Sequence, residues 1–121
     1  MERELTSHKV NGCNDAISVA VLDGPGCGGA SHEYRIAAEG PPGFCFELRF
    51  QNGPLREAGV NGLTHESLLA VIEDRLAGFQ AGPYATTDNA EALAHVRGAM
   101  ECLHRRTKER VARGVEGTHA K

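Results

Sequence analysis

The spacing of apolar residues changes near the middle of this chain, and that change restricts the folds open to it. Before residue 52, apolar and polar residues alternate, as in "FCFELRFQ" over 44–51. Alternation places every second side chain on one face of a half-buried strand. After residue 63, apolar residues recur at intervals of three and four, as on one side of an amphipathic helix. A strand-rich half followed by a helical half predicts an α+β fold.

The first half contains three alternating runs separated by glycine and proline. The runs cover 16–23, 31–40 and 44–51, with "DGPGCGGA" and "EGPPG" in the gaps between them. Glycine and proline at this density end strands and form turns. We therefore predict a small antiparallel sheet of three strands in up-and-down order. Its inward face should carry Phe44, Phe46, Leu48 and Phe50.

The second half contains two helical stretches. In the first, Thr64 is expected to cap the helix "THESLLAVIEDRLAGFQ", which should end before Pro83 because proline cannot continue it. Its apolar stripe is Leu68, Leu69, Ile72, Leu76 and Phe79.

The second helix should open with a capping box at Asp88-x-x-Glu91 and end near Gly114, which suits the first position past a helix. The short connection between the helices predicts an antiparallel two-helix hairpin. The stripe of the second helix is Leu93, Val96, Met100, Leu103 and Val111.

A turn-rich segment, "FQNGPLREAGVNGLT" over 50–64, joins the two halves. We expect one compact unit in which residues 1–55 form the small sheet and residues 56–121 form the helical hairpin with a glycine-containing tail. A lone hairpin buries only one seam, and a chain of 121 residues buries a modest part of its surface. We therefore expect the hairpin to associate with further copies of the chain, which would bury more of its apolar surface.

Composition excludes several classes of function. The net charge of −3 argues against general attraction to a nucleic acid polymer, and no apolar run is long enough for a membrane helix. The charged start "MERE" has no apolar signal core behind it, so we expect a cytoplasmic protein with reduced thiols. The cysteines are expected to be small buried side chains: Cys13, Cys27, Cys45 and Cys102.

No motif predicts catalysis, a metal or a cofactor. The glycine-rich "DGPGCGGAS" lacks a Gly-Lys-Ser/Thr ending and leads into a strand, so it is expected to be a hairpin turn. The histidines lack zinc-ligand spacing, and no serine or cysteine stands in a nucleophile elbow. We expect a protein that is not an enzyme.

The basic residues near the C-terminus form the strongest candidate site. Residues 103–121 contain six Lys or Arg against two Glu, a local charge of +4. Arg106, Arg110 and Arg113 fall on one helix face at i, i+4 and i+7. Two interpretations stay open, because cations at a helix C-terminus also complement the helix dipole, whereas the planar guanidinium suits phosphate oxygens.

An aromatic residue and an amide suggest the rest of a nucleotide site. Phe79 ends the first helix and Asn89 begins the second, so they lie across the hairpin loop from each other. Asn89 and Arg106 are 17 residues apart in the sequence, or about 25 Å along a helix. A single site containing Phe79, Asn89, Arg106 and Arg110 would therefore need a second protomer packed antiparallel to the first.

The stretch from "FQNGPLREAGVNGLTHESLLAVIEDRLAGFQAGPYATTDNAEAL" to "RRTKERVARGVEGTHAK" resembles the helical-hairpin family of phage anti-defence nucleotide sponges. With "GGASHEY" at 28–34, the chain is most similar to the first Thoeris anti-defence family, which is related to the anti-CBASS cyclic-nucleotide sponges. The chain departs from the family pattern at Thr86-Thr87-Asp88, where relatives commonly carry a basic residue beside the asparagine. Residues 1–27 match nothing specific.

The resemblance implies a sponge, which binds cyclic ADP-ribose isomers made by Thoeris TIR proteins and holds them without cleavage. Some members also hold CBASS cyclic trinucleotides at separate sites. Members form homodimers, and several form hexamers as trimers of dimers. They act in the cytoplasm of the infected bacterial host. By motif position, the resemblance assigns ligand binding to Phe79, Asn89, Arg106 and Arg110, and more weakly to Arg56 and Thr118.

Three other functions stay open. A hydrolase would destroy the cyclic nucleotide, and a structural or interaction module of a phage would use the arginines only to cap its helices. A nucleic-acid binder would use the basic tail, and its affinity would fall steeply with salt.

Overall fold

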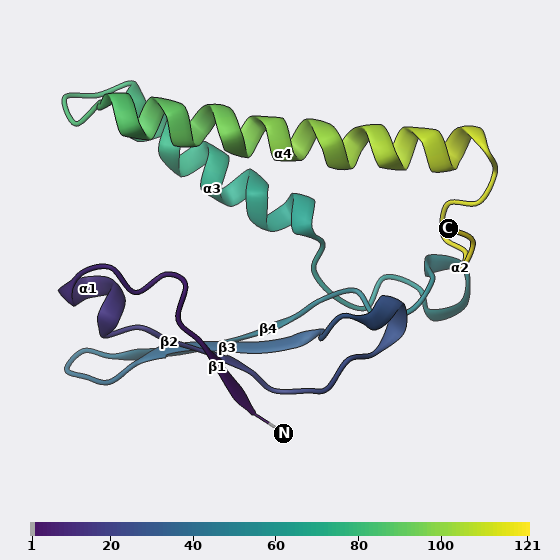
Figure 1. Cartoon of the computed structure of the whole chain (residues 1–121), viewed down its shortest axis with the longest axis horizontal. Helices are drawn as coiled ribbons and strands as arrows, with labels where there is room; N and C mark the ends of the chain where they lie inside the picture. Colours follow the sequence, from purple (N-terminus) through teal and green to yellow (C-terminus); the bar gives the residue numbers. More distant parts are fainter. Residues whose placement is uncertain (1) are drawn as a thin grey trace. The chain divides into compact units, whose positions relative to one another are not determined.

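The computed structural model describes residues 2–121, which form two compact units. The first unit holds the residues up to Gly53 together with Ala58–Leu63, and the second holds Pro54–Glu57 and Thr64–Lys121. The ribbon in Figure 1 shows strands in the first unit and two long helices in the second. The predicted α+β class is confirmed.

The first unit is a four-stranded antiparallel sheet in the order β1-β2-β3-β4. The strands are β1 (Arg3–Leu5), β2 (Ser18–Val21), β3 (Glu33–Ala38) and β4 (Phe44–Arg49). The up-and-down order of the three predicted strands is confirmed, but the number of strands was wrong. β1 has only three residues, too few to show alternation, and a four-residue helix α1 (Gly12–Asp15) separates it from β2.

Register gathers the apolar residues of the sheet on one face. Val19 pairs with Ile36, which pairs with Phe46 on β4. Val21 lies opposite Tyr34 and is fully buried. The expected inward set therefore shares a face, but Phe46 is 62% exposed, so this face is only partly buried.

The loop between β2 and β3 is held by one carboxylate. Asp23 accepts the backbone N–H of Glu33 at 3.0 Å and that of His32 at 3.0 and 3.1 Å. The hydrogen bond from Glu33 contributes most to holding the pKa of Asp23 below its usual 3.8, and the bond from His32 lowers it further. The loop contains a 3₁₀ turn, η1 (Cys27–Gly29), whose Cys27 carbonyl contacts the buried His32 ring at 3.0 Å. The predicted hairpin turn is therefore built on Asp23.

The cysteines do not fill the core as expected. All four are free and exposed. Cys45 lies on β4 between the two exposed rings of Phe44 and Phe46, whose centroids are 5.6 Å apart. Strand alternation therefore puts Cys45 on the face opposite the aromatic residues, where no strand or helix of the first unit covers it.

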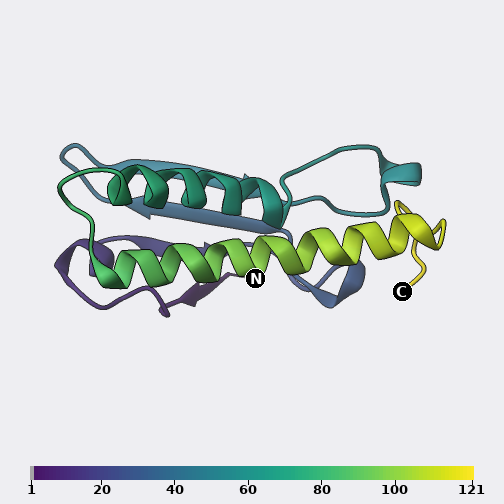
Figure 2. The ribbon, with the colours of Figure 1, turned by 90° about the horizontal axis from the view of Figure 1, so that it is seen from above.

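The second unit is the predicted hairpin of α3 (His65–Gln80) and α4 (Thr87–Ala112), which run side by side in Figure 2. Thr64 caps α3 as predicted and exchanges side-chain bonds with Ser67. The predicted cap at Asp88 was wrong by two residues, because Thr86 accepts the N–H of Asn89 at 3.0 Å. A hydroxyl placed three residues before that N–H caps the helix earlier than the carboxylate.

The seam of α4 corrects the predicted stripe at its last position. Val111 is 61% exposed, whereas Arg110 is only 5% exposed. Steps of three and four from Leu93 reach Val96, Met100, Leu103, Thr107 and Arg110, and each of these residues is buried or half-buried. An arginine therefore occupies the last inward position of the helix.

No helix of residues 2–121 has both the length and the apolar character needed to cross a membrane.

Asp23→Asn should destabilise the sheet, most strongly at neutral pH. The pKa of Asp23 is lowered on folding, so its stabilisation is complete above the unfolded-state pKa and disappears as pH falls through the folded-state value. Urea unfolding followed by circular dichroism should show a lower midpoint for Asp23→Asn at pH 7 and a narrowing difference from the parent protein below pH 3.8. The exposed Asp15→Asn serves as control. A difference that stays constant with pH would contradict this role of Asp23.

Candidate functional site

The loop end of the hairpin carries the predicted aromatic residue and amide. Phe79 lies in the last turn of α3 and is 40% exposed. The guanidinium of Arg75, one turn earlier, lies 5.1 Å from the centre of its ring. Asn89 lies in the first turn of α4 and donates its backbone N–H to the Thr86 hydroxyl, so that cap leaves the side-chain amide of Asn89 available.

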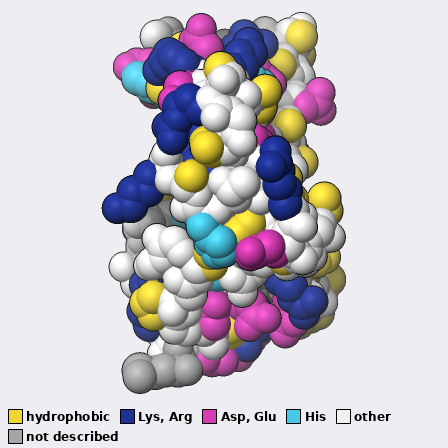
Figure 3. All heavy atoms as spheres, turned by 90° about the vertical axis from the view of Figure 1, so that its right-hand side faces the viewer, with side chains coloured by type: hydrophobic (Ala, Val, Ile, Leu, Met, Phe, Trp, Pro, Cys, Tyr) yellow, Lys and Arg dark blue, Asp and Glu magenta, His cyan; other side chains and the backbone are white. Residues whose placement is uncertain are grey.

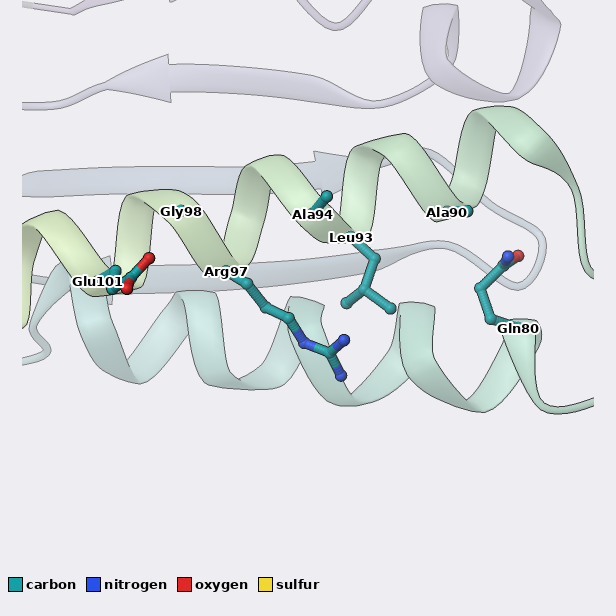
Figure 4. Close-up of a pocket in the computed structure, with 7 residues that line it drawn as sticks. All are labelled: Gln80, Ala90, Leu93, Ala94, Arg97, Gly98 and Glu101. Atoms are coloured by element: carbon teal, nitrogen blue, oxygen red, sulfur yellow. The ribbon is translucent and has the colours of Figure 1, made fainter.

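An open groove of about 520 Å³ lies between α3 and α4 next to these residues. Figure 4 shows small residues on α4 as its floor, with Gln80, Arg97 and Glu101 around them. Arg97 reaches across to Glu73 of α3 at 3.1 Å and ties the helices together. The residues around the groove are Gln80, Ala90, Leu93, Ala94, Arg97, Gly98 and Glu101.

At the other end, α4 closes with a Schellman motif. Gly114 has φ of +72°, a left-handed conformation that glycine adopts without strain. Its N–H bonds the Val111 carbonyl at 3.0 Å, and the N–H of Val115 bonds the Arg110 carbonyl at 3.0 Å. The predicted end of the helix at Gly114 is confirmed. The motif turns the tail back toward the helix end.

Arg110 holds the returning tail. Its guanidinium donates to the carbonyls of Val115 at 2.9 Å, Thr118 at 3.2 Å and Ala120. Its Nε lies 3.6 Å from Oε1 of Glu116. The side chain of Arg110 is 6% exposed, against 32% for Glu116. These carbonyls and this carboxylate occupy the positions that a phosphate would take, so the assignment of Arg110 as a phosphate ligand stays a prediction.

The tail also binds the short helix α2 (Leu55–Ala58). The backbone N–H of Arg56 donates to the Gly117 carbonyl at 3.1 Å. Nε2 of His119 lies 3.0 Å from Oε2 of Glu57. Gly117 has φ of +80°, and a Cβ there would lie 3.2 Å from Cγ of Arg56. Only glycine therefore suits this contact. We call residues 54–57, Arg110 and the tail 113–120 the C-terminal clasp.

The clasp brings together three of the residues predicted from the sequence: Arg56, Arg110 and Thr118. Arg106 lies one turn before Arg110 and is exposed. Within residues 2–121, neither Arg56 nor Arg106 has an acidic partner. Arg113 instead pairs with Glu109 at 3.0 Å. Figure 3 shows Lys and Arg side chains interspersed with Asp and Glu on this face. Arg56 and Arg106, which lack an acidic partner among the described residues, are the groups here that suit an anion.

The structure separates the two groups of candidate residues along α4. Asn89 and Arg110 lie 21 positions apart on one continuous helix, a distance of about 31 Å. A single chain therefore presents an aromatic and amide end and a separate cationic end. A site that contained both groups would require a second copy packed antiparallel, as the spacing in the sequence implies.

Sequence reasoning missed several residues that shape these two ends. Spacing predicts no role for Gln80 and no partner for Glu116, and it predicts a turn at Gly117 but not its contact with Arg56, because each acts through a partner brought near by chain reversal. Glu116 offered one signal, an acid inside a basic segment, and a buried arginine requires such a partner.

Groups for metal or nucleophilic chemistry do not assemble in the part of the chain that the structure describes. No cluster of three His, Cys, Asp or Glu residues there could hold a metal ion. His32 is buried, but its ring meets a backbone carbonyl rather than a serine or cysteine side chain.

Comparison with known proteins identifies the same hairpin. The family model described as "Acb2/Tad1, hairpin domain" matches residues 46–108, more than half of the 121 residues. A protein named Thoeris anti-defense 1, from Bacillus phage SBSphiJ7, is 43% identical over 74 residues. That alignment covers 61% of this chain and 52% of the relative, so the chain spans about half the length of the curated relative it matches.

Arg110→Ala should destabilise the second unit by about 2–4 kcal/mol, because it removes the ion pair with Glu116 and the hydrogen bonds to three tail carbonyls. The control is Arg113→Ala, which removes an exposed pair with Glu109 and should cost less than about 1 kcal/mol. Urea unfolding measures both values, and limited proteolysis with mass spectrometry should show faster cleavage within 113–120 for Arg110→Ala. Equal behaviour of the two variants would mean that Arg110 does not hold the tail.

Proposed function

This chain belongs to the Acb2/Tad1 hairpin-domain family, and we propose that it is a phage anti-defence protein that sequesters signalling nucleotides. The proposed ligands are cyclic ADP-ribose isomers made by Thoeris TIR proteins. The protein holds the signal without cleaving it, in the cytoplasm of the infected host. The name of the phage relative, Thoeris anti-defense 1, supports the defence system that we propose.

The proposal rests mainly on which residues of the chain the family model matches. Residues 46–108 include Arg56, both hairpin helices up to Lys108, the exposed side chains of Phe79 and Arg106, and the half-buried Asn89. The match therefore covers the parts of the chain that present an aromatic face, an amide and free guanidinium groups. These are the groups that a nucleotide requires.

Each group has a role that its chemistry permits. The ring of Phe79 stacks on the adenine base, and the amide of Asn89 bonds the base edge or a ribose hydroxyl. Arg106 and Arg56 bind the pyrophosphate. Arg110 and Thr118 contribute by shaping the clasp, in which Gly114 and Gly117 allow the chain to reverse. Because Asn89 and Arg110 lie on the same helix about 31 Å apart, we propose that two antiparallel protomers form each complete site.

The proposed assembly is a homodimer, which can associate further into a hexamer as a trimer of dimers. Exposed apolar residues on α3, Val71 at 65% and Ile72 at 46%, support association of the hairpins. Cyclic trinucleotides of CBASS systems are proposed as further ligands, at sites separate from the cyclic ADP-ribose site.

A release assay tests sequestration directly. Pure protein is incubated with the product of an active Thoeris TIR enzyme, and the free nucleotide is filtered away. Heat denaturation of the protein should release an unchanged nucleotide that chromatography identifies and that activates the Thoeris effector. Recovery of linear ADP-ribose would instead establish a hydrolase.

Substitutions test the proposed contacts. Phe79→Ala should weaken binding by about 1–3 kcal/mol, the usual contribution of one base stacked on an aromatic ring. Asn89→Ala and Arg106→Ala should each weaken it about tenfold, or about 1.4 kcal/mol. Arg105→Ala is the matched control, because Arg105 is directed to the sulfur of Cys102 at 3.4 Å. Calorimetry measures these affinities, and unchanged values for all three variants would reject the site.

Thermal unfolding separates the sponge from an interaction module. A nucleotide present at 100 times its Kd should stabilise the folded protein by about 2.7 kcal/mol. An interaction module, whose arginines only cap the helices, would show no shift with any cyclic nucleotide.

A further inference from the structure

Gln80 joins the two helix ends at the hairpin loop. It is the last residue of α3 and follows Phe79 directly. Its side-chain amide donates to the Thr86 carbonyl at 3.1 Å and accepts the Thr86 N–H at 3.0 Å. Both peptide groups of Thr86 are therefore held by one side chain.

Thr86 continues this connection to Asn89. Thr86 is the N-cap of α4, and its hydroxyl accepts the backbone N–H of Asn89 at 3.0 Å. A chain of three hydrogen bonds thus runs from the residue beside Phe79 to the backbone of Asn89. We propose that Gln80 is a positioning residue for the ligand site, which sets the separation between the Phe79 ring and the Asn89 amide. This inference rests on the proposed function.

The rest of the loop offers little restraint of its own. Within the loop, the N–H of Gly82 bonds the Phe79 carbonyl at 3.2 Å and that of Ala85 bonds the Gly82 carbonyl at 3.3 Å. The Tyr84 ring is 74% exposed, so it does not anchor the loop by packing. Gln80 is accordingly the side chain, among the described residues, that fixes the start of α4 against the end of α3 by hydrogen bonds.

The chemistry requires a glutamine at this position. The two bonds need one donor and one acceptor on the same planar group, which a carboxamide supplies. Glutamate keeps the acceptor for the Thr86 N–H but loses the donor and places a negative charge against the Thr86 carbonyl. Gln80 also borders the groove in Figure 4, beside Ala90, so a shift of its side chain changes the loop end of the groove.

The test compares Gln80→Ala and Gln80→Glu with Thr64→Ala. Thr64 caps the opposite end of α3, so its loss weakens the same helix about 24 Å from the loop. The probe is the cyclic ADP-ribose isomer released by an active Thoeris TIR enzyme, measured by calorimetry, with thermal unfolding in parallel. Both Gln80 variants should bind the probe about tenfold more weakly, while Thr64→Ala lowers the unfolding midpoint similarly and keeps the parent affinity.

A double-substitution cycle separates positioning from stability. If Gln80 acts through Asn89, adding Gln80→Ala to Asn89→Ala should weaken binding less than about twofold further. Amide hydrogen exchange should also show faster exchange at Asn89 in Gln80→Ala. Parent affinity in both Gln80 variants, or independent effects in the cycle, would overturn the inference and leave the proposed function standing. Failure of the parent protein to retain the probe would overturn both.

Discussion

The buried guanidinium of Arg110 is the interaction on which the C-terminal half depends. It sits where the seam of α4 would otherwise require an apolar side chain, and the tail meets it with three carbonyls and the Glu116 carboxylate. A buried cation is costly without such partners, so the helix end and the tail are stable only together. Gly114 makes the reversal possible, and Gly117 lets the reversed tail contact Arg56.

This arrangement gives the two ends of one helix different chemistry. The start of α4 faces a loop fastened by Gln80 and carries an aromatic ring and an amide nearby. Its end carries cations, of which Arg110 is used internally and Arg106 is exposed. Unlike ends of this kind complement each other when two hairpins lie antiparallel, because each end with the ring and the amide then meets a cationic one. The proposed nucleotide, with a flat base and a charged pyrophosphate, has the same division.

The sheet unit is organised by a single carboxylate in a comparable way. Asp23 gathers the N–H groups at the start of β3, and the glycine-rich loop can then leave the sheet without its own packed core. Each unit therefore uses one charged side chain to terminate a regular element and to shape the loop or tail beside it. In both cases most of the partners are backbone groups, and Arg110 has the Glu116 carboxylate in addition.

The amino-acid sequence by itself determined the α+β class, three of the four strands, the two long helices α3 and α4, the Thr64 cap and the end of α4 at Gly114. These features follow from local spacing: alternation, steps of three and four, and turn residues act within a few positions of one another. The motif that relates the chain to its family could also be recognised from the sequence. Phe79 and Asn89 could be assigned to the loop end, since each borders a helix terminus.

Only the tertiary structure decided the features that depend on distant partners. Residue types alone predict an apolar stripe on α4 that runs to Val111. In the structure the inward face of α4 ends at Arg110, because Glu116 and the returning tail make the burial of this arginine possible. Cys45 is exposed although its residue type favours burial, because its strand position fixes the face on which its side chain lies. Gln80, an ordinary polar helix end in the sequence, became a link when the loop brought Thr86 within 3.1 Å of it. The spacing of apolar and turn residues determines where the helices and strands form. The reversals of the chain determine which side chains come into contact.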